Sequence, residues 1–453
     1  MYIRTILKVI LLAIILIACK NQDITNNENP SLPAKSFSLD TLQKDAFHYF
    51  WEEANVSNGL IPDRSPTETF SSIAATGFGL TCYLIGIENG YIARQQAGER
   101  VLKTLTFFWE SPQSTGPSGV NGYKGFFYHF LDMDTGTRFE EVELSTIDTG
   151  LLMAGILSCQ SYFNRDDSLE NNIRAYADSL YRRVEWDWAM QDNGLMSMGW
   201  HPESGFIDHT WQGYNEAMIL LILALGSPTH PIAENAWQKW TETYEWKSFY
   251  DYEYLNFAPL FGHQYSQMYI DFREIQDDYM RGKGIDYFEN SIRATLANRA
   301  YCIDNPGNFA GYGENNWGLT ACDGPGPIDT DSLTYLSYWA RGAAATAVRD
   351  DGTIAPTAAG GSIPFAPEEC ILALEHMYEK HGNKLYGKYG FRDAFNETLE
   401  WFDQDYLGID QGPIVIQIQN FRNEFVWELM KKNKYVVEGL RKAGFRGGWL
   451  DIH

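Results

Sequence analysis

The 453-residue sequence predicts an all-α fold, an (α/α)6 barrel in which helical hairpins stand in a ring. Apolar residues recur with the period of an amphipathic helix in about a dozen segments, whereas segments with the alternation of a strand are few and short. The connections between helices are long at alternate turns, as hairpins in a ring require. Neither a linker nor a change of composition interrupts residues 37–453, so we expect one large domain there.

The individual helices follow from the spacing of apolar residues along the chain. We expect them at 39–53, 71–89, 93–110, 146–163, 168–184, 214–225, 231–243, 286–302, 331–348, 367–380, 391–402, 411–431 and 435–443. Strands are expected only in the connections, where alternating residues flank turns: one hairpin pairs 125–131 with 137–140, and another pairs 195–200 with 205–207. These hairpins should lie in the loops on the active-site face of the barrel.

Residues 1–18 have the pattern of an export signal. A basic start precedes an apolar run of about ten residues, too short to cross a bilayer as a lasting helix. The run ends in Leu-Ile-Ala-Cys, which is similar to a bacterial lipobox, so we expect lipid on Cys19 and a flexible tether over 19–36. The chain would then be a cell-envelope lipoprotein, on the outer membrane facing the periplasm or the cell surface. An ordinary cleaved signal peptide is the alternative.

Charge and composition limit the class of partner. The formal net charge of −24 would repel the phosphates of nucleic acid but not a neutral glycan. Aromatic residues make up 15% of the chain, which supplies flat apolar faces for sugar rings. We therefore expect a monomer that binds an oligo- or polysaccharide and touches the membrane only through its lipid.

No motif predicts a metal or a cofactor. The spacings Cys-x-x-Cys and His-Glu-x-x-His do not occur in the sequence. Asp132, Asp134 and Gly136 are similar to a calcium loop but lack the acidic ligand at its end. Cys302 and Cys322 flank one loop and could pair in an oxidising compartment, which the sequence leaves open.

Carboxylates stand at the start of two apolar helices. Glu216 precedes one apolar run, and Glu143 and Asp148 precede another. An ionised carboxylate is costly to bury without a partner. These residues are therefore expected at the mouth of a cleft, unless they serve only as helix caps. Acidic helix starts in an aromatic-rich chain indicate a glycosidase.

A series of motifs, in order along nearly the whole mature chain, resembles the bacterial glucoamylase-like family. They are ELSTIDTG (143–150), GYNEA (213–217), ALGSPTHP (224–231), FGHQYS (261–266), IDFR (270–273), WGLTA (317–321), DGTIAP (351–356), LGIDQGP (407–413) and GFRGGWL (444–450). The resemblance implies an (α/α)6 barrel of glycoside hydrolase family 144, with endo-β-1,2-glucanase activity, inversion and a neutral β-glucan as substrate. Related domains of cyclic β-1,2-glucan synthases support the same linkage.

The sequence departs from this family at one motif. Relatives typically carry Ile-Glu-Asn-Tyr-Arg where this chain has Ile-Gln-Asn-Phe-Arg at 418–422. An amide replaces a carboxylate at Gln419, which argues against a catalytic role for this position and bears on substrate preference.

An inverting glycosidase needs an acid that protonates the leaving oxygen and a base that activates water, with the two carboxyl groups roughly 6.5–9.5 Å apart. Glu216 is our choice for the acid, because Trp211, Tyr214 and the apolar helix could raise its pKa by desolvation. The resemblance implies that the proton can pass through a substrate hydroxyl. For the base, Asp148 ranks slightly ahead of Glu143 and Asp410.

Sugar binding needs flat apolar faces ringed by hydrogen-bonding groups. The aromatic candidates are Trp200, Trp211, Tyr214, Tyr265, Trp317 and Trp449, and the polar candidates are His263, Gln264, Arg273, Gln419 and Arg422. For each His alone, a structural role is at least as well supported. Two other functions stay open. The paired carboxylates argue against a non-catalytic glycan-binding lipoprotein, and the charge of −24 argues against a polysaccharide lyase, whose substrates are acidic.

Overall fold

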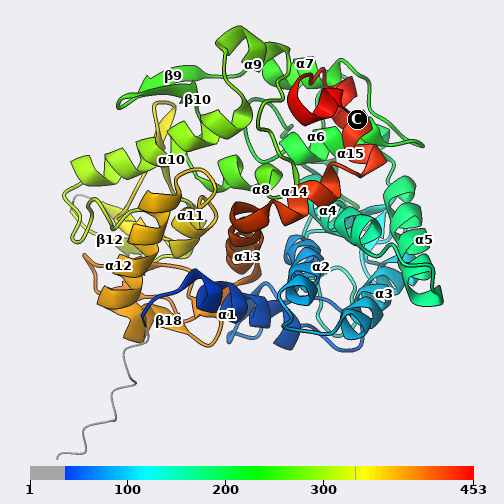
Figure 1. The fold of residues 1–453 in the computed structure, drawn as a ribbon, viewed down its shortest axis with the longest axis horizontal. Coiled ribbons are helices and arrows are strands. Elements are labelled where there is room, and N and C mark those ends of the chain that lie inside the picture. The colour runs from blue at the N-terminus through cyan, green and yellow to red at the C-terminus, as the bar shows by residue number, and fades with distance from the viewer. Residues whose placement is uncertain (1–35, 332, 453) are drawn as a thin grey trace, which may run out of the picture. The chain divides into compact units, whose positions relative to one another are not determined.

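The computed structural model describes residues 36–331 and 333–452, in which helices dominate (Figure 1). The helices are α1 (Leu39–Glu52), α2 (Ile73–Glu88), α3 (Arg94–Glu110), α4 (Thr146–Tyr162), α5 (Ser168–Arg183), α6 (Met218–Gly226), α7 (Ala236–Thr241), α8 (Phe261–Tyr269), α9 (Asp278–Lys283), α10 (Tyr287–Asp304), α11 (Pro356–Gly360), α12 (Pro367–Leu385), α13 (Gly408–Asn423), α14 (Phe425–Met430) and α15 (Lys434–Lys442). Short 3-10 helices occur at Trp186–Ala189 and Gly448–Asp451.

The strands are short, from two to four residues each. They are β1 (Arg64–Ser65), β2 (Ser71–Ser72), β3 (Gly122–Tyr123), β4 (Phe126–Tyr128), β5 (Phe130–Leu131), β6 (Leu144–Ser145), β7 (Gly199–His201), β8 (Gly205–Phe206), β9 (Trp246–Phe249), β10 (Tyr252–Leu255), β11 (Ala321–Cys322), β12 (Ile328–Asp329), β13 (Thr334–Tyr335), β14 (Trp339–Ala340), β15 (Gly342–Ala344), β16 (Ala347–Arg349), β17 (Thr353–Ile354), β18 (Tyr386–Gly387), β19 (Gly390–Phe391), β20 (Phe395–Asn396), β21 (Trp401–Phe402) and β22 (Tyr406–Leu407). The largest sheet is antiparallel, in the order β3-β4-β6-β7-β8.

The apolar helices are enclosed by amphipathic ones. α2, α4, α6 and α13 are buried along almost their whole length, so they must be covered on every side. In α5, by contrast, buried residues recur every three or four positions, at Ile173, Ala177 and Leu180. Figure 1 shows α13 near the middle of the view, with α1, α3, α5 and α12 at the periphery. The described part of the chain is thus a helical fold with its most apolar helices inside.

Two glycines allow α2 and α4 to approach each other closely. A Cβ atom at Gly155 would lie 2.0 Å from the Gly77 carbonyl oxygen, and one at Gly77 would lie 2.6 Å from the Leu151 carbonyl oxygen. Neither position can hold a larger side chain without moving a helix backbone. This contact fixes α4, whose first turn carries Asp148.

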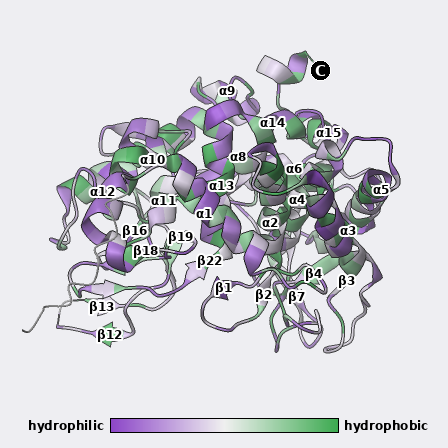
Figure 2. Ribbon diagram, turned by 60° about the horizontal axis from the view of Figure 1, so that its bottom comes forward, coloured by the Kyte–Doolittle hydropathy of each residue, from purple (hydrophilic) through white to green (hydrophobic). Residues whose placement is uncertain are grey.

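Several inner helices begin directly where a short strand ends. β2 leads into α2, β6 into α4 and β22 into α13. Figure 2 shows β1, β2, β4, β7 and β22 together at one end of the helices. The first turns of these helices therefore meet at the strand-bearing end, where side chains in three different helices can face one cavity.

Most of the predicted helices are present, but two are wrong. The segment predicted as a helix at 331–348 contains β13 to β16 instead. Its alanine-rich part forms a hairpin in which Gly342 lies against another loop, since a Cβ atom there would be 2.2 Å from the Ala258 carbonyl carbon. Residues 391–402 form β19 to β21. The predicted helix 411–431 is divided at Glu424, which has a left-handed backbone with φ of 60°.

Of the two predicted hairpins, β7 and β8 confirm the one across 195–207. The hairpin across 125–140 is present only beside its turn, where Leu131 and Arg138 form an antiparallel bridge and the Phe139 N–H donates to the Phe130 carbonyl at 3.1 Å. Farther from the turn, β4 pairs with β3 and β6 instead.

A buried ion pair anchors the β14–β17 region. The side chains of Arg341 and Asp351 are both fully buried, and the guanidinium donates two hydrogen bonds of 2.7 Å to the carboxylate. Removing one partner of such a pair leaves an uncompensated charge, at a cost of about 3–5 kcal/mol. We expect Asp351→Ala to lower the free energy of unfolding in urea by that amount. The exposed Asp331→Ala should change it by no more than about 0.5 kcal/mol, and a loss as small for Asp351→Ala would contradict the argument.

The predictions for the signal peptide, for Cys19 and for most of the tether concern residues 1–35, which lie outside the described residues and stay predictions. Residues 37–453 form one compact unit. In its described part no helix combines the length and the apolar character needed to span a bilayer. Cys302 and Cys322 are both buried and free, so the structure does not pair them.

Candidate active site

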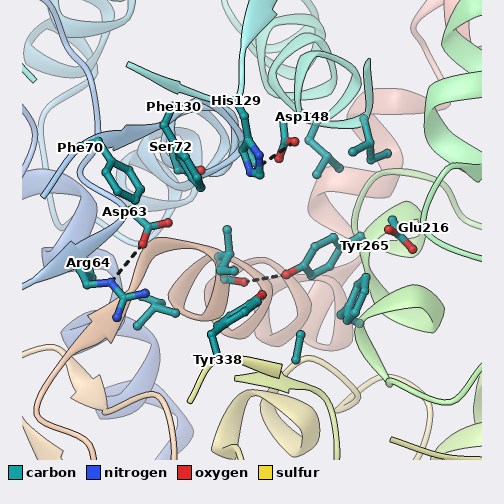
Figure 3. Close-up of a pocket in the computed structure, with 17 residues that line it drawn as sticks. Asp63, Arg64, Phe70, Ser72, His129, Phe130, Asp148, Glu216, Tyr265 and Tyr338 are labelled. Carbon is teal, nitrogen blue, oxygen red and sulfur yellow. Dashed lines mark hydrogen bonds and ion pairs between the residues drawn. The ribbon is translucent and has the colours of Figure 1, made fainter. Parts of the chain in front are cut away.

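A cavity of about 320 Å³ lies among the first turns of the inner helices and the strands that precede them. Its volume falls in the range of small-molecule sites. Its polar lining comes from Asp63, Arg64, Ser72, His129, Asp148, Glu216, Tyr265 and Tyr338. Figure 3 shows Glu216 on one side and the Asp63–Arg64 pair on the opposite side, with His129 and Asp148 along a third edge. The cavity therefore brings together two of the predicted catalytic carboxylates, Glu216 and Asp148.

Glu216 stands in the turn that precedes α6. Burial raises the pKa of its carboxyl to about 7, and the negative charge of Asp148 adds to the effect. Its Oε2 atom is buried and has no hydrogen-bond partner among the described residues. A carboxyl group that keeps its proton near neutral pH and has a free oxygen is suited to donate that proton to a bound substrate.

Asp148 and Glu143 are joined through a histidine. His129 Nδ1 lies 2.8 Å from Glu143 Oε1, and its Nε2 lies 3.5 Å from Asp148 Oδ2 (Figure 3). Burial alone would lower the pKa of His129, but the charges of Asp148 and Glu143 outweigh it and raise the pKa to about 9. The same imidazolium holds the pKa of Glu143 below its usual value despite burial. Glu143 thus orients a histidine, and the histidine faces Asp148 in the cavity.

Ser145 holds Asp148 from the other side. As the N-cap of α4, its hydroxyl oxygen accepts the Asp148 backbone N–H at 3.2 Å, and its O–H donates to Asp148 Oδ2. With His129 also in contact, the orientation of the Asp148 carboxylate is fixed before any substrate arrives.

Asp410 occupies the corresponding first turn of α13 but does not line the cavity, although its neighbours Leu407 and Ile409 do. It is buried beside Asp393. Burial raises the pKa of Asp393 to about 7, and burial together with the charge of Asp393 raises that of Asp410 well above its usual range.

Of the sugar-binding residues predicted from the sequence, Tyr265 lines the cavity, where its hydroxyl donates to the Ile409 carbonyl at 3.3 Å. The others lie away from its lining: Trp200, Trp211, Tyr214, His263, Gln264, Arg273, Trp317, Gln419, Arg422 and Trp449. Trp317 is fully buried, and burial lowers the pKa of His263 to about 4, so this histidine is a neutral core residue.

Several of these residues instead hold the protein together. Trp211 donates to Thr146 Oγ1 at 2.9 Å and so supports the first turn of α4. Gln264 donates to the Ala358 carbonyl at 2.9 Å and links α8 to α11. Gln419 accepts from Gln43 at 3.0 Å. It lies ten residues beyond Ile409 along α13, roughly 15 Å at the rise of a helix.

Arg273, Trp449 and Arg422 also make internal contacts. Arg273 pairs with Asp271 at 2.7 Å, and Trp449 donates to the Asp271 carbonyl at 2.8 Å, so both fix one loop. Arg422, at the end of α13, forms an ion pair with Asp40. Tyr214 stacks on Tyr287, and Trp200 packs against Tyr123 and Trp188.

Sequence reasoning missed five polar residues of the cavity: Asp63, Arg64, Ser72, His129 and Tyr338. They lie in strands and loops, where no helical period marks them. Arg64 pairs with Asp323 at 2.5 Å and with Asp63 at 3.2 Å, which places a cation opposite Glu216. The one signal available was the pair of charges at Asp63-Arg64, which precedes a proline in a loop.

Known proteins similar to this chain have the same fold and include glucan hydrolases. A family model named Glycoamylase, with the description "Putative glucoamylase", matches residues 208–434. An exo beta-1,2-glucooligosaccharide sophorohydrolase (non-reducing end) of Parabacteroides distasonis is 31% identical over 438 residues, 89% of this chain and 57% of the relative. The chain thus spans little more than half the length of that relative.

Two solved structures are similar over most of the chain. An endo-beta-1,2-glucanase from Chitinophaga pinensis, in complex with sophorotriose and glucose, is 30% identical with a TM-score of 0.80, over 91% of this chain and 100% of that one. A beta-1,2-glucanase from Parabacteroides distasonis is 30% identical with a TM-score of 0.78, over 90% of this chain and 59% of that one.

Proposed function

Because this chain belongs to the glycoamylase family, we propose that it is a glycoside hydrolase that cleaves β-1,2-linked glucan. The observation that carries the proposal is the buried carboxyl of Glu216, with its raised pKa and free oxygen, beside Asp148 in one cavity. The named activities of the sophorohydrolase and the two glucanases support the linkage.

We propose that the inner helices close into the ring of an (α/α)6 barrel. α2 packs on α4, α4 on α6, and α6 on α8. α8 is joined to α11 through the Gln264 hydrogen bond, α11 packs on α13, and α13 packs on α2, which completes the circuit. Such a ring would set the first turns of α4 and α13 and the turn before α6 around one opening.

In the proposed mechanism Glu216 donates its proton to the leaving glycosidic oxygen, either directly or through a substrate hydroxyl. A carboxylate on the other side of the sugar takes a proton from water as the water attacks the anomeric carbon, which inverts the configuration. Asp148 is our choice for this base, since it lines the cavity and is held by Ser145 and His129. Arg64 and Tyr338 would supply donors to sugar hydroxyls.

We propose endo rather than exo action. The chain covers the whole of the endo-glucanase structure, with 30% identity and a TM-score of 0.80, and that relative's named activity supports endo action. Cleavage within a glucan chain requires that the substrate can extend from the site in both directions. A second hollow, at Pro66, Thr67 and Glu68, shares Arg64 and Phe70 with the cavity. This hollow would extend the glucan-binding path on the Arg64 side of the site.

The test is a panel of linear glucans with β-1,2, β-1,3, β-1,4 and α-1,4 linkages, incubated with the purified protein and followed by separation of the products. We expect only β-1,2-glucan to be shortened, to saturated oligosaccharides of several lengths at early times. A single early disaccharide would show exo action. Cleavage of another glucan with β-1,2-glucan intact would refute the linkage, unsaturated ends would indicate a lyase, and binding without products would indicate a glycan-binding protein.

A further inference from the structure

Three aspartates from separate loops meet beside the first turn of α13. Asp323 follows β11, Asp393 lies between β19 and β20, and Asp403 follows β21. One carboxylate oxygen from each lies within 4.8 Å of the other two. A calcium ion bound at 2.3–2.6 Å from each ligand spans oxygens separated by up to about 5 Å. The spacing therefore fits one shared cation.

The protein supplies donors to only one side of the two buried carboxylates. Asp393 Oδ2 accepts the Asp323 backbone N–H at 2.7 Å, and Asp403 Oδ1 accepts the Gln404 and Asp405 N–H groups at 2.6 and 3.1 Å. The opposite oxygens, Asp393 Oδ1 and Asp403 Oδ2, are buried and have no partner in the described part of the chain. Each aspartate thus keeps one free oxygen in the interior.

Asp410, which is not one of the three aspartates, also has a buried carboxylate oxygen without a partner in residues 36–331 and 333–452. It is 4% exposed, and its Oδ2 has no hydrogen-bond partner among the described residues. An unpartnered polar oxygen is costly to bury.

Arg64 does not provide enough positive charge to balance these carboxylates. Arg64 pairs with Asp323 at 2.5 Å, but also with Asp63 at 3.2 Å and Asp405 at 3.9 Å. Within residues 36–331 and 333–452, Asp393, Asp403 and Asp410 form no ion pair with a Lys, Arg or His. Tyr338 and Cys322, which also face the cluster, carry no positive charge in any state, and Arg341 and Arg392 donate to the backbone carbonyls of Asp323 and Asp403 rather than to the carboxylates.

We propose that Asp323, Asp393 and Asp403 form a binding site for a hard divalent cation, calcium in preference to magnesium. All the donors are oxygens, which hard cations prefer, and calcium tolerates the irregular arrangement that three loops provide. The bound cation joins the loops after β11, β19 and β21 to each other and lies next to Asp410. The site is separate from the proposed hydrolysis, and either can fail without the other.

The test measures calcium binding to the wild-type protein after removal of metals with EDTA. Titration calorimetry with CaCl₂ at pH 8 should show one site, and saturating calcium should raise the melting temperature. MgCl₂ should bind more weakly.

Asp403→Asn keeps the shape of the cluster but removes a ligand charge, and it should weaken calcium binding at least tenfold. Asp134→Asn is the matched control: its acidic turn is already closed by hydrogen bonds from Thr135 to Asp132, so calcium binding should not change. No heat of binding to wild type at pH 8, with a melting temperature that saturating calcium does not change, would overturn the proposal.

Discussion

Replacing Glu216 by Gln is expected to lower kcat by about 10²- to 10⁴-fold, the usual contribution of a general acid. The amide keeps the shape of the side chain but cannot donate the proton that the leaving oxygen needs. The wild-type carboxyl, with its pKa raised to about 7 by burial, is protonated below that pH. The activity of wild type should therefore fall as the pH rises through about 7, and this limb should be absent from the residual activity of Glu216→Gln.

Stability separates this role from that of a helix cap. Loss of a cap costs about 0.5–2 kcal/mol and leaves the folded fraction active. Between the pKa of Glu216 in the unfolded chain and its higher pKa in the folded protein, the carboxyl ionises only on unfolding, so the stability of wild type falls as the pH rises. Glu216→Gln does not ionise, so it should be as stable as wild type near pH 5 and more stable above pH 7. Glu234→Gln, an exposed acid before α7, is the control and should change neither property. A destabilised Glu216→Gln protein within threefold of wild-type activity would refute the assignment.

The sequence predicted the inner helices well because their signals are local. The apolar runs of α4 and α6, and the acidic residues that precede them, need no knowledge of distant parts of the chain. The same reasoning placed Asp148 and Glu216 at helix starts, and the structure brings both to one cavity. It failed at 331–348, where alanines favour a helix but the burial of Arg341 against Asp351 and the packing of Gly342 impose strands.

The partners in the site could not be predicted because they come from distant segments. His129 follows β4 and contacts Glu143, which precedes β6, and its contact with Asp148 depends on how β4 and β6 pair. Arg64 meets Asp323 across more than two hundred residues. The predicted sugar-binding aromatics illustrate the converse: Trp317 lies in a motif, as a binding residue would, but it is buried, and a motif cannot distinguish these two reasons for a tryptophan.

Replacing Asp148 by Ala is expected to lower kcat by about 10²- to 10⁴-fold as well, because no carboxylate then activates the water. Asp148 lines the cavity that contains Glu216, and its charge acts on Glu216. Asp410 is another candidate, but it lies outside the lining, and burial together with the charge of Asp393 raises its pKa well above the usual range, which disfavours the ionised form that a base needs. Asp410→Asn should therefore retain more activity than Asp148→Ala.

Azide distinguishes a base from a residue that merely shapes the site, because a small anion can enter the space left by the lost carboxylate and attack the anomeric carbon without a base. Asp148→Ala with sodium azide should recover activity and yield a glycosyl azide of α configuration, the product of inversion at a β linkage. Ser145→Ala is the matched control: it loosens Asp148 but leaves the carboxylate in place, so azide should give no such product. Rescue of Asp410→Ala with none of Asp148→Ala would move the base to α13, and Asp393 would then be the group that sets its protonation.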